Sequence, residues 1–305
     1  MAVIDVGTHS VLYLLVEKNA RGDAISLFQE IQSVRLGRNV DNAGTIQGEV
    51  LTEALQVLKH YRALASQQEA DQIVVVGTHV FRAARNRKTV CKRIQNETGL
   101  NVEILIEKEE AEWSYRGAVY GRKWLGQNTV VDIGGGSTEV VLGKENEIVD
   151  WESTNLGAVG VTERFIHHDP PLPTEFSAME TSVFSSLKDK GASLLKQGER
   201  LIAVGGTATT LAALDLRLKK YDPHRVDRYV MRYSTIENIL DRMKRIPLAK
   251  RKKLLKLDPD RADIILAGAT ILKICMRLGR FEEVIVSDRG LRFGIALREL
   301  TATHL

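Results

Sequence analysis

Acidic, hydroxyl and glycine residues are gathered in one short segment, VVDIGGGSTEVVLG, which covers residues 130–143. Asp132 precedes three consecutive glycines, and Ser137, Thr138 and Glu139 follow them. A glycine turn lets backbone N–H groups converge on an anion, and hydroxyl groups add further donors. Carboxylates bind hard cations directly or through water. The segment therefore predicts a loop that holds phosphate together with Mg²⁺ or Mn²⁺.

The sequence after the glycines, TEVVLG, is typical of a strand, so the segment predicts a strand–turn–strand unit. Neither the G-x-x-x-x-G-K-[ST] phosphate loop nor a G-x-G-x-x-G motif opening a helix is present. The alternative is an ordinary hairpin with glycines at its tip, in which no ligand is bound.

The same pattern occurs near the start of the chain, where AVIDVGTHSVLYLL aligns with TVVDIGGGSTEVVL without a gap. Both copies continue into two further strand-like runs and then into a Leu-Gly pair. We therefore predict two related domains, each opening with a D-x-G-x-x-S turn. The aligned pairs are Asp5 with Asp132, Gly7 with Gly134, Ser10 with Ser137 and Leu15 with Leu142, and the pairs Leu36-Gly37 and Leu156-Gly157 arrive at similar places after slightly shorter loops in the second copy.

A third glycine turn lies in LIAVGGTATTL, residues 201–211. An apolar strand is followed by Gly205-Gly206-Thr207 and a helix of small residues, whose free N–H groups would favour an anion. The alternative is a glycine pair that only permits close packing of strand on helix.

Strand and helix patterns alternate along the 305 residues, which predicts an α/β fold. We expect domain I over residues 1–122 and domain II over 123–290, with segment 291–305 as a helix that completes domain I. Expected strands cover 1–6, 10–17, 24–36, 72–77, 102–106, 129–134, 138–142, 147–153, 201–204 and 284–286; expected helices cover 49–68, 88–98 and 108–120 and begin near 161, 174 and 291.

Composition narrows the class of protein without identifying it. The net charge is +4, the two cysteines lack partners at metal-ligand spacing, and no apolar run reaches membrane-spanning length. A cytoplasmic protein is expected. Residues 217–256 hold fourteen Lys or Arg against four acids, which predicts either a track for a polyanion or a solvated helical surface. Aromatic residues do not alternate with the basic ones in the pattern that would indicate a nucleic-acid-binding surface.

The residues of these motifs and their order along the chain resemble the exopolyphosphatase/guanosine pentaphosphate phosphatase (Ppx/GppA) family, within the actin, Hsp70 and sugar-kinase superfamily. The resemblance covers nearly the whole chain. It is carried by IDVGTHS (4–10), VVGTHVFRAARN (75–86), EKEEAEWSYRGAV (107–119), VVDIGGGSTEVVLG (130–143), NLGAVGVTERF (155–165), AVGGTATTLAAL (203–214), YDPHRV (221–226), RADIILAGATIL (261–272) and VSDRGLRFGIAL (286–297).

The resemblance implies two ribonuclease H-like domains with a cleft between them, and Mg²⁺-dependent hydrolysis of a terminal phosphoanhydride. It implies inorganic polyphosphate or guanosine penta- or tetraphosphate as partners. No membrane or nucleic-acid partner is expected, and a homodimer is left open as the assembly. The implied catalytic residues are Glu110, Glu139 and Arg82; the alternative for Arg82 is a salt bridge across domain I. Implied metal ligands are Asp5, Asp132 and Glu139, and implied phosphate-binding residues are Thr8, Ser10, Gly134, Gly135, Gly136, Ser137, Thr138, Gly205, Gly206 and Thr207.

Two segments depart from the family pattern. The first loop has Thr8-His9-Ser10 where the family usually has Ser-Asn-Ser, and Asp227-Arg228 stand where the family commonly has His-Gly. The chain also lacks the additional C-terminal helical region of longer members. Two other functions remain as alternatives: an ATP-dependent kinase of the same superfamily, and a regulatory protein that binds polyphosphate or an alarmone.

Overall fold

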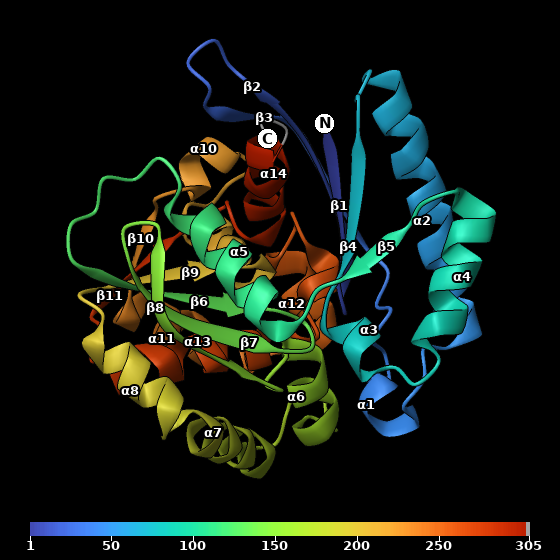
Figure 1. Cartoon of the computed structure of the whole chain (residues 1–305). Helices are drawn as coiled ribbons and strands as arrows, with labels where there is room; N and C mark the ends of the chain where they lie inside the picture. Colours follow the sequence, from blue (N-terminus) through green and yellow to red (C-terminus); the bar gives the residue numbers. More distant parts are fainter. Residues whose placement is uncertain (303–305) are drawn as a thin grey trace. The chain divides into compact units, whose positions relative to one another are not determined.

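Two β-sheets, each with its own helices, form the described part of the molecule, residues 1–302 of the computed structural model (Figure 1). Residue contacts divide the chain into unit 1, Met1–Gly117 with the segment from Leu291 onward, and unit 2, Ala118–Gly290. The division after residue 117 falls slightly before the position expected from the sequence. Among the helices of residues 1–302, none has the length and apolar character that a membrane crossing requires.

The sheet of unit 1 has the strand order β3-β2-β1-β4-β5. Strands β1, β2 and β3 form an antiparallel meander, and β4 and β5 add to β1 in parallel. The runs AVIDV and IVVVG lie in its interior, as their β-branched residues favour. The strands are β1 Ala2–Val6, β2 Ser10–Lys18, β3 Ala24–Ser33, β4 Ile73–Gly77 and β5 Val102–Ile104.

Six helices belong wholly or mainly to unit 1. They are α1 Val40–Ala43, α2 Gly48–Gln67, α3 His79–Ala83, α4 Arg87–Thr98, α5 Glu107–Val119 and α14 Leu291–Ala302. The apolar stripe of α2 packs into the core with Leu55, Leu58 and Tyr61. Helix α14, from the far end of the chain, packs against β1 and β2, where Arg292 Nη1 donates to the Tyr13 carbonyl at 3.1 Å.

The sheet of unit 2 has the order β10-β11-β9-β6-β7-β8. Strands β6, β7 and β8 form the antiparallel meander, while β9 and β11 extend the sheet in parallel. The short antiparallel strand β10 pairs with β11 at the edge and was not expected from the sequence. The strands are β6 Gln127–Ile133, β7 Thr138–Lys144, β8 Glu147–Thr154, β9 Arg200–Val204, β10 Val230–Arg232 and β11 Glu283–Val286.

Helix α13, Ile265–Gly279, lies at the centre of the helical part of unit 2 and packs against α6, α7, α8, α9 and α11. It is apolar along most of its surface because helices surround it. The other elements are α6 Ala158–Phe165, α7 Pro173–Leu187, α8 Lys190–Gln197, α9 Gly206–Asp215, α10 Pro223–Val226, α11 Tyr233–Met243, α12 Leu248–Leu254 and the 3₁₀ turn Pro259–Arg261.

The two sheets share one topology, apart from the added β10. The order β3-β2-β1-β4-β5 corresponds to β8-β7-β6-β9-β11, with the same strand directions. Both meanders also carry a register shift at equivalent places, between Leu15 and Val16 in β2 and between Leu142 and Gly143 in β7. A shared bulge in addition to a shared strand order supports the two-domain repeat predicted from the sequence.

Candidate active site

The turn between β1 and β2 in unit 1 is closed by a backbone hydrogen bond from Gly7 N to Ser10 O at 3.0 Å. The side chains of Thr8 and Ser10 are buried, and both hydroxyl oxygens lack a hydrogen-bond partner in the described structure. A buried hydroxyl without a partner loses its hydration, so a ligand that accepts a hydrogen bond would stabilise it. His9 lies in the same turn, with Nε2 at 3.4 Å from Ser33 Oγ.

The turn between β6 and β7 in unit 2 has the same closure, from Gly134 N to Ser137 O at 3.0 Å. The carbonyls of Gly134 and Gly135 accept hydrogen bonds from the first residues of α6, Ala158 and Val159, at 3.0 and 2.9 Å. In a trans peptide the N–H points away from the carbonyl. The N–H groups of the two peptides that follow these carbonyls, at positions 135 and 136, therefore point away from α6 and remain directed toward the outside of the turn.

Gly157 is required where α6 meets this turn. A Cβ at that position would lie 2.1 Å from Gly135 O and 2.2 Å from Gly136 Cα, so a side chain cannot be accommodated without moving the turn. The Thr138 hydroxyl donates to Leu156 O at 2.5 Å and holds the same junction. That hydroxyl was expected to bind phosphate; in the structure its hydrogen is used to fix the turn.

Asp132 and Glu139 are directly paired residues of β6 and β7, so their side chains project from the same face of the sheet. Glu139 is almost completely buried and accepts a hydrogen bond from Ser153 Oγ at 2.8 Å. Asp132 Oδ1 lies 3.0 Å from the position that a Cβ on Gly205 would occupy. The carboxylate therefore lies beside the beginning of α9.

These residues are suited to a hard cation. Two carboxylates supply the oxygen ligands that Mg²⁺ prefers, and Mg²⁺ usually takes its remaining ligands from water and substrate phosphate. Within residues 1–302 no group of three or more His, Cys, Asp or Glu is spaced to enclose a metal by itself. Asp132 and Glu139 therefore fit a cation that is shared with substrate, and Asp5 occupies the position equivalent to Asp132 in unit 1.

Helix α9 begins at the third glycine turn, and Gly205 adopts φ +88°. Side chains cannot be added here: a Cβ on Gly206 would meet the Arg261 guanidinium at 2.2 Å. Arg261 is buried and donates from Nε to Asp258 Oδ2 at 2.7 Å. The Thr207 hydroxyl is buried without a hydrogen-bond partner in the described structure. Arg261 adds positive charge to this helix N-terminus, where N–H groups already favour anions.

Glu110 lies in the first turn of α5 in unit 1, and its Oε2 is 2.5 Å from Nη1 of Arg82, on α3. Burial raises the pKa of Glu110 above its usual range, and the charge and hydrogen bond of Arg82 oppose that shift. Arg82 Nη1 also donates to Leu105 O at 3.0 Å, whereas Nε and Nη2 lack partners in the described structure. A carboxylate and two unused guanidinium donors thus lie together in unit 1.

The neighbouring acid Glu109 has a different role, because its Oε2 accepts from Ile106 N at 3.0 Å at the start of α5. This is the capping role expected for an acid that is not catalytic.

The basic segment 217–256 is mostly exposed, but one residue was misassigned. Arg251 is buried and pairs through Nη2 with Asp169 Oδ1 at 3.0 Å, and its Nη1 donates to Ile246 O at 2.9 Å. It anchors α12 and is unavailable to a polyanion. Lys244 is half-buried, and the other twelve basic residues are exposed.

Sequence reasoning missed Arg261 and Ser153, because both reach the site through tertiary packing. Arg261 lies in the segment RADIILAGATIL, which was noted as a motif without a role. Ser153 lies opposite Glu139 in β8. The alignment of β7 with β8 was the signal that could have identified it.

Known proteins resemble this chain over nearly its whole length. The profile of the Ppx/GppA phosphatase family matches residues 15–303. Exopolyphosphatase 2 of Mycobacterium tuberculosis is 31% identical over 97% of each chain. A crystal structure of the Aquifex aeolicus Ppx/GppA family member is 32% identical, covers 100% of this chain and 98% of its own, and superposes with a TM-score of 0.82. An exopolyphosphatase structure from Cytophaga hutchinsonii, 24% identical with coverage of 99% and 97%, has a TM-score of 0.91 and shares the fold.

Proposed function

The chain belongs to the Ppx/GppA phosphatase family, and from this we infer that it is a cation-dependent exopolyphosphatase that releases terminal phosphate from inorganic polyphosphate. The observation that carries the proposal is the pairing of Asp132 with Glu139 beside the glycine turn of β6 and β7. The two carboxylates would hold Mg²⁺ or Mn²⁺ together with substrate phosphate. A bound divalent cation supplies neutralisation of the charge on the phosphate oxygens.

The turns would bind phosphate through main-chain groups. The outward N–H groups at positions 135 and 136 donate to phosphate oxygens in this proposal, and Ser137 adds a hydroxyl. In unit 1 the unpartnered hydroxyls of Thr8 and Ser10 serve the same purpose. The start of α9 at Gly206 offers further N–H donors next to the Arg261 charge.

Glu110 is proposed to orient and deprotonate the water that attacks the terminal phosphorus. Its burial raises its pKa, which makes the carboxylate a stronger base than an exposed one. Arg82 keeps Glu110 in place, and its two unused donors can stabilise negative charge on the transferred group.

Guanosine pentaphosphate carries the same kind of terminal phosphoanhydride, so it is proposed as a further substrate of the same site. Polyphosphate is preferred in the proposal because exposed basic side chains are concentrated in segment 217–256, which suits a long chain of charges.

The proposal is tested by phosphate release from long and short polyphosphate, guanosine pentaphosphate and ATP, with and without Mg²⁺. Glu110→Gln keeps the shape of the side chain and should lower turnover by about two to four orders of magnitude. Glu109→Gln is the matched control, because Glu109 only caps the helix. This variant should retain most of the activity. A Glu110→Gln enzyme with more than half of wild-type turnover would overturn the catalytic assignment.

The basic segment is tested separately. Lys250, Lys252 and Lys253 are replaced by Gln while the buried Arg251 is left intact. Binding of long polyphosphate should weaken much more than binding of short polyphosphate, and its dependence on salt should become shallower. The control replaces Lys59, Lys88 and Lys92, three exposed lysines of unit 1. Equal effects on long and short substrates would identify the segment as a solvated surface.

A further inference from the structure

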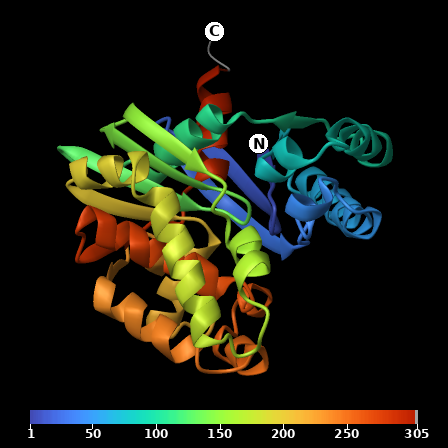
Figure 2. The same cartoon turned by 90° about the horizontal axis from the view of Figure 1, so that it is seen from below.

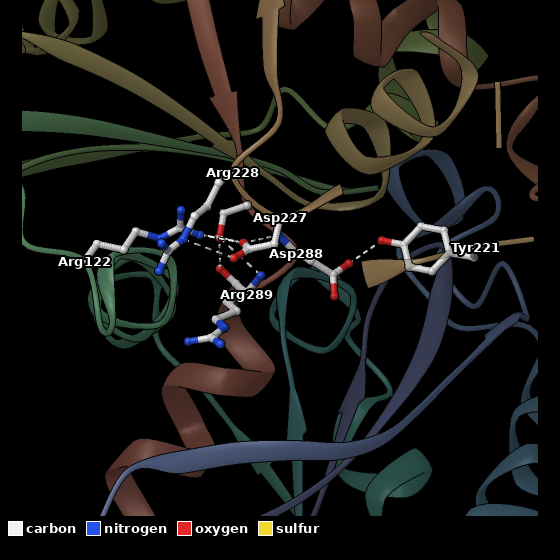
Figure 3. Close-up of polar contacts among 7 residues, drawn as sticks. Arg122, Tyr221, Asp227, Arg228, Asp288 and Arg289 are labelled. Carbon is white, nitrogen blue, oxygen red and sulfur yellow. Dashed lines mark hydrogen bonds and ion pairs between the residues drawn. The ribbon is translucent and has the colours of Figure 1, made fainter. Parts of the chain in front are cut away.

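The chain passes between the two units twice, after Gly117 and after Gly290. We call residues 118–126 and 287–290 the crossing segments; both belong to unit 2 on this division. Arg122 lies in the first, and Ser287, Asp288 and Arg289 form most of the second. Figure 3 shows the Arg122 guanidinium directed at the Asp227 carboxylate, whereas the side chain of Asp288 is directed at Tyr221.

The Asp227 carboxylate is the common partner of both crossing segments. Its Oδ1 lies 2.5 Å from Arg122 Nη2 in the first segment. The same oxygen accepts from the backbone N–H of Asp288 in the second segment at 3.2 Å. Arg122 Nη2 also donates directly to Ser287 Oγ at 2.8 Å, so the two segments are joined both to each other and to Asp227.

Because Arg122 is buried, its charge depends on the Asp227 carboxylate. The Arg122 side chain is only 1% exposed, and its guanidinium lies 4.9 Å from the ring centroid of Trp124. Burial lowers the pKa of Arg122, and the Asp227 carboxylate opposes that shift. A desolvated guanidinium needs its counter-ion, so loss of Asp227 would leave an uncompensated buried charge. By contrast, Arg228 approaches Asp227 only at 3.9 Å and is largely exposed.

The network is continuous in sequence with two helices. Helix α5, which carries Glu110 in its first turn, ends at Val119, just before Arg122. Helix α14 begins at Leu291, just after the second crossing segment. In unit 1 these helices are in close contact, because a Cβ on Gly294 would lie 1.8 Å from Trp113 O. Helices α5 and α14 are therefore in contact, and the segments that adjoin them are linked by the Arg122–Ser287 hydrogen bond.

We propose that Asp227 is a positioning residue that clamps the two crossing segments together and fixes the C-terminal end of α5, the helix whose first turn carries Glu110. The effect on turnover depends on the proposed function, whereas the clamp itself does not.

The test is Asp227→Asn, which preserves shape and removes the charge. Amide hydrogen exchange over residues 118–127 should become about tenfold faster, because local opening no longer breaks a buried ion pair. Trypsin should also cut after Arg122 more readily. Turnover should fall while KM for short polyphosphate changes little, as expected when geometry rather than binding is lost. Asp227→Glu restores the charge and should partly recover both the slow amide exchange and the turnover.

Glu283→Gln is the matched control. Glu283 lies on β11, the strand just before the second crossing segment, and forms an exposed ion pair with Arg232. This variant should leave exchange over residues 118–127 unchanged. Should Asp227→Asn fail to fold, Ser287→Ala removes the neutral hydrogen bond from Arg122, together with the Ser287 contacts to Asp227 and the Arg289 backbone, and should still accelerate that exchange. Unchanged exchange in a folded Asp227→Asn or in Ser287→Ala overturns the clamp. A wild-type protein without phosphatase activity overturns the proposed function instead, and leaves the exchange measurement decisive.

Discussion

The β1–β2 turn of unit 1 and the β6–β7 turn of unit 2 have the same backbone closure but different side chains. Each is closed by a 3.0 Å hydrogen bond from a glycine N–H to a serine carbonyl. In unit 2 the residue paired with Asp132 is Glu139, whereas in unit 1 the residue paired with Asp5 is Leu12. The repeat therefore preserved a loop that suits phosphate, and only unit 2 gained a carboxylate pair.

The glycines that support the two turns differ in the same way. Gly157 approaches the backbone of its turn, whereas Gly37 approaches the Thr8 side chain, with a Cβ position 2.1 Å from Thr8 Cγ2. Unit 2 has Gly135 and Gly136 at the tip of the turn, where unit 1 has Thr8 and His9. In the proposed function the carboxylate pair of unit 2 would bind the cation, and unit 1 would contribute a base and hydroxyl donors.

The largest expected effect comes from the carboxylate pair. Asp132→Asn and Glu139→Gln should each lower kcat/KM by about a hundredfold or more, and raise the Mg²⁺ concentration needed for half-maximal activity. Asp5→Asn should cost about tenfold, since its partner on the neighbouring strand, Leu12, is not a carboxylate. Cation titrations of the three variants measure this. Equal losses and equal cation dependence at Asp5 and Asp132 would contradict the division between the units.

The supporting glycines give the next effect. Gly157→Ala forces backbone atoms of the turn apart and should lower stability by about 1–3 kcal/mol together with most of the activity. Gly37→Ala should cost less, because the Thr8 side chain can move. Adding Thr8→Ser to Gly37→Ala removes the obstructing methyl group and should restore stability. Thermal melting and turnover decide the matter, and equal damage from the two alanines would remove the distinction.

A smaller effect is expected in the pH profile. The charge of Arg82 lowers the pKa of Glu110, while burial raises it. Arg82→Leu removes the lowering contribution, so Glu110 stays protonated to higher pH and the acidic limb of kcat/KM should move to higher pH. Arg82→Lys keeps the charge and should move it less. An acidic limb that stays in place in Arg82→Leu would mean that Glu110 is not the group observed.

The smallest effect concerns the unit 1 hydroxyls. Ser10→Ala removes a buried oxygen without a hydrogen-bond partner in the described structure, so the free energy of unfolding should be unchanged within about 0.5 kcal/mol or slightly raised. KM for polyphosphate should rise by a few-fold, because a donor to phosphate is lost. A clear loss of stability with normal KM would show that the hydroxyl serves packing alone.

Local patterns predicted most of the fold. The apolar runs of β1, β4, β6 and β9 and the helical stripe of α2 were legible because burial imposes a period on the sequence. The repeat of the D-x-G-x-x-S turn predicted the shared topology. Strand β10 was missed because its three residues are too few to show a period, and its place depends on pairing with β11.

The site was predicted less completely. The residues of the glycine turns could be named because their types and spacing are unusual, and their roles in catalysis stay predictions. A salt bridge of Arg82 was one expectation, but its partner Glu110 was not predicted, nor was the packing of Arg261 against Gly206, since these partners are far apart in sequence. Arg251 was misassigned for the related reason that burial of a long cationic side chain leaves no mark on local composition.

The discontinuity of unit 1 has a consequence for biosynthesis. Unit 2 is a single stretch of chain, so it can complete its core as soon as Gly290 has left the ribosome. Unit 1 is begun before unit 2, yet α14, which packs against β1 and β2, follows unit 2 in the chain and is made after it. Until then the face of the sheet that α14 covers stays open, and closing it requires contacts between opposite ends of the chain. The half of the protein that starts first is therefore the half that finishes last, and its nascent form is the one that most needs protection from aggregation.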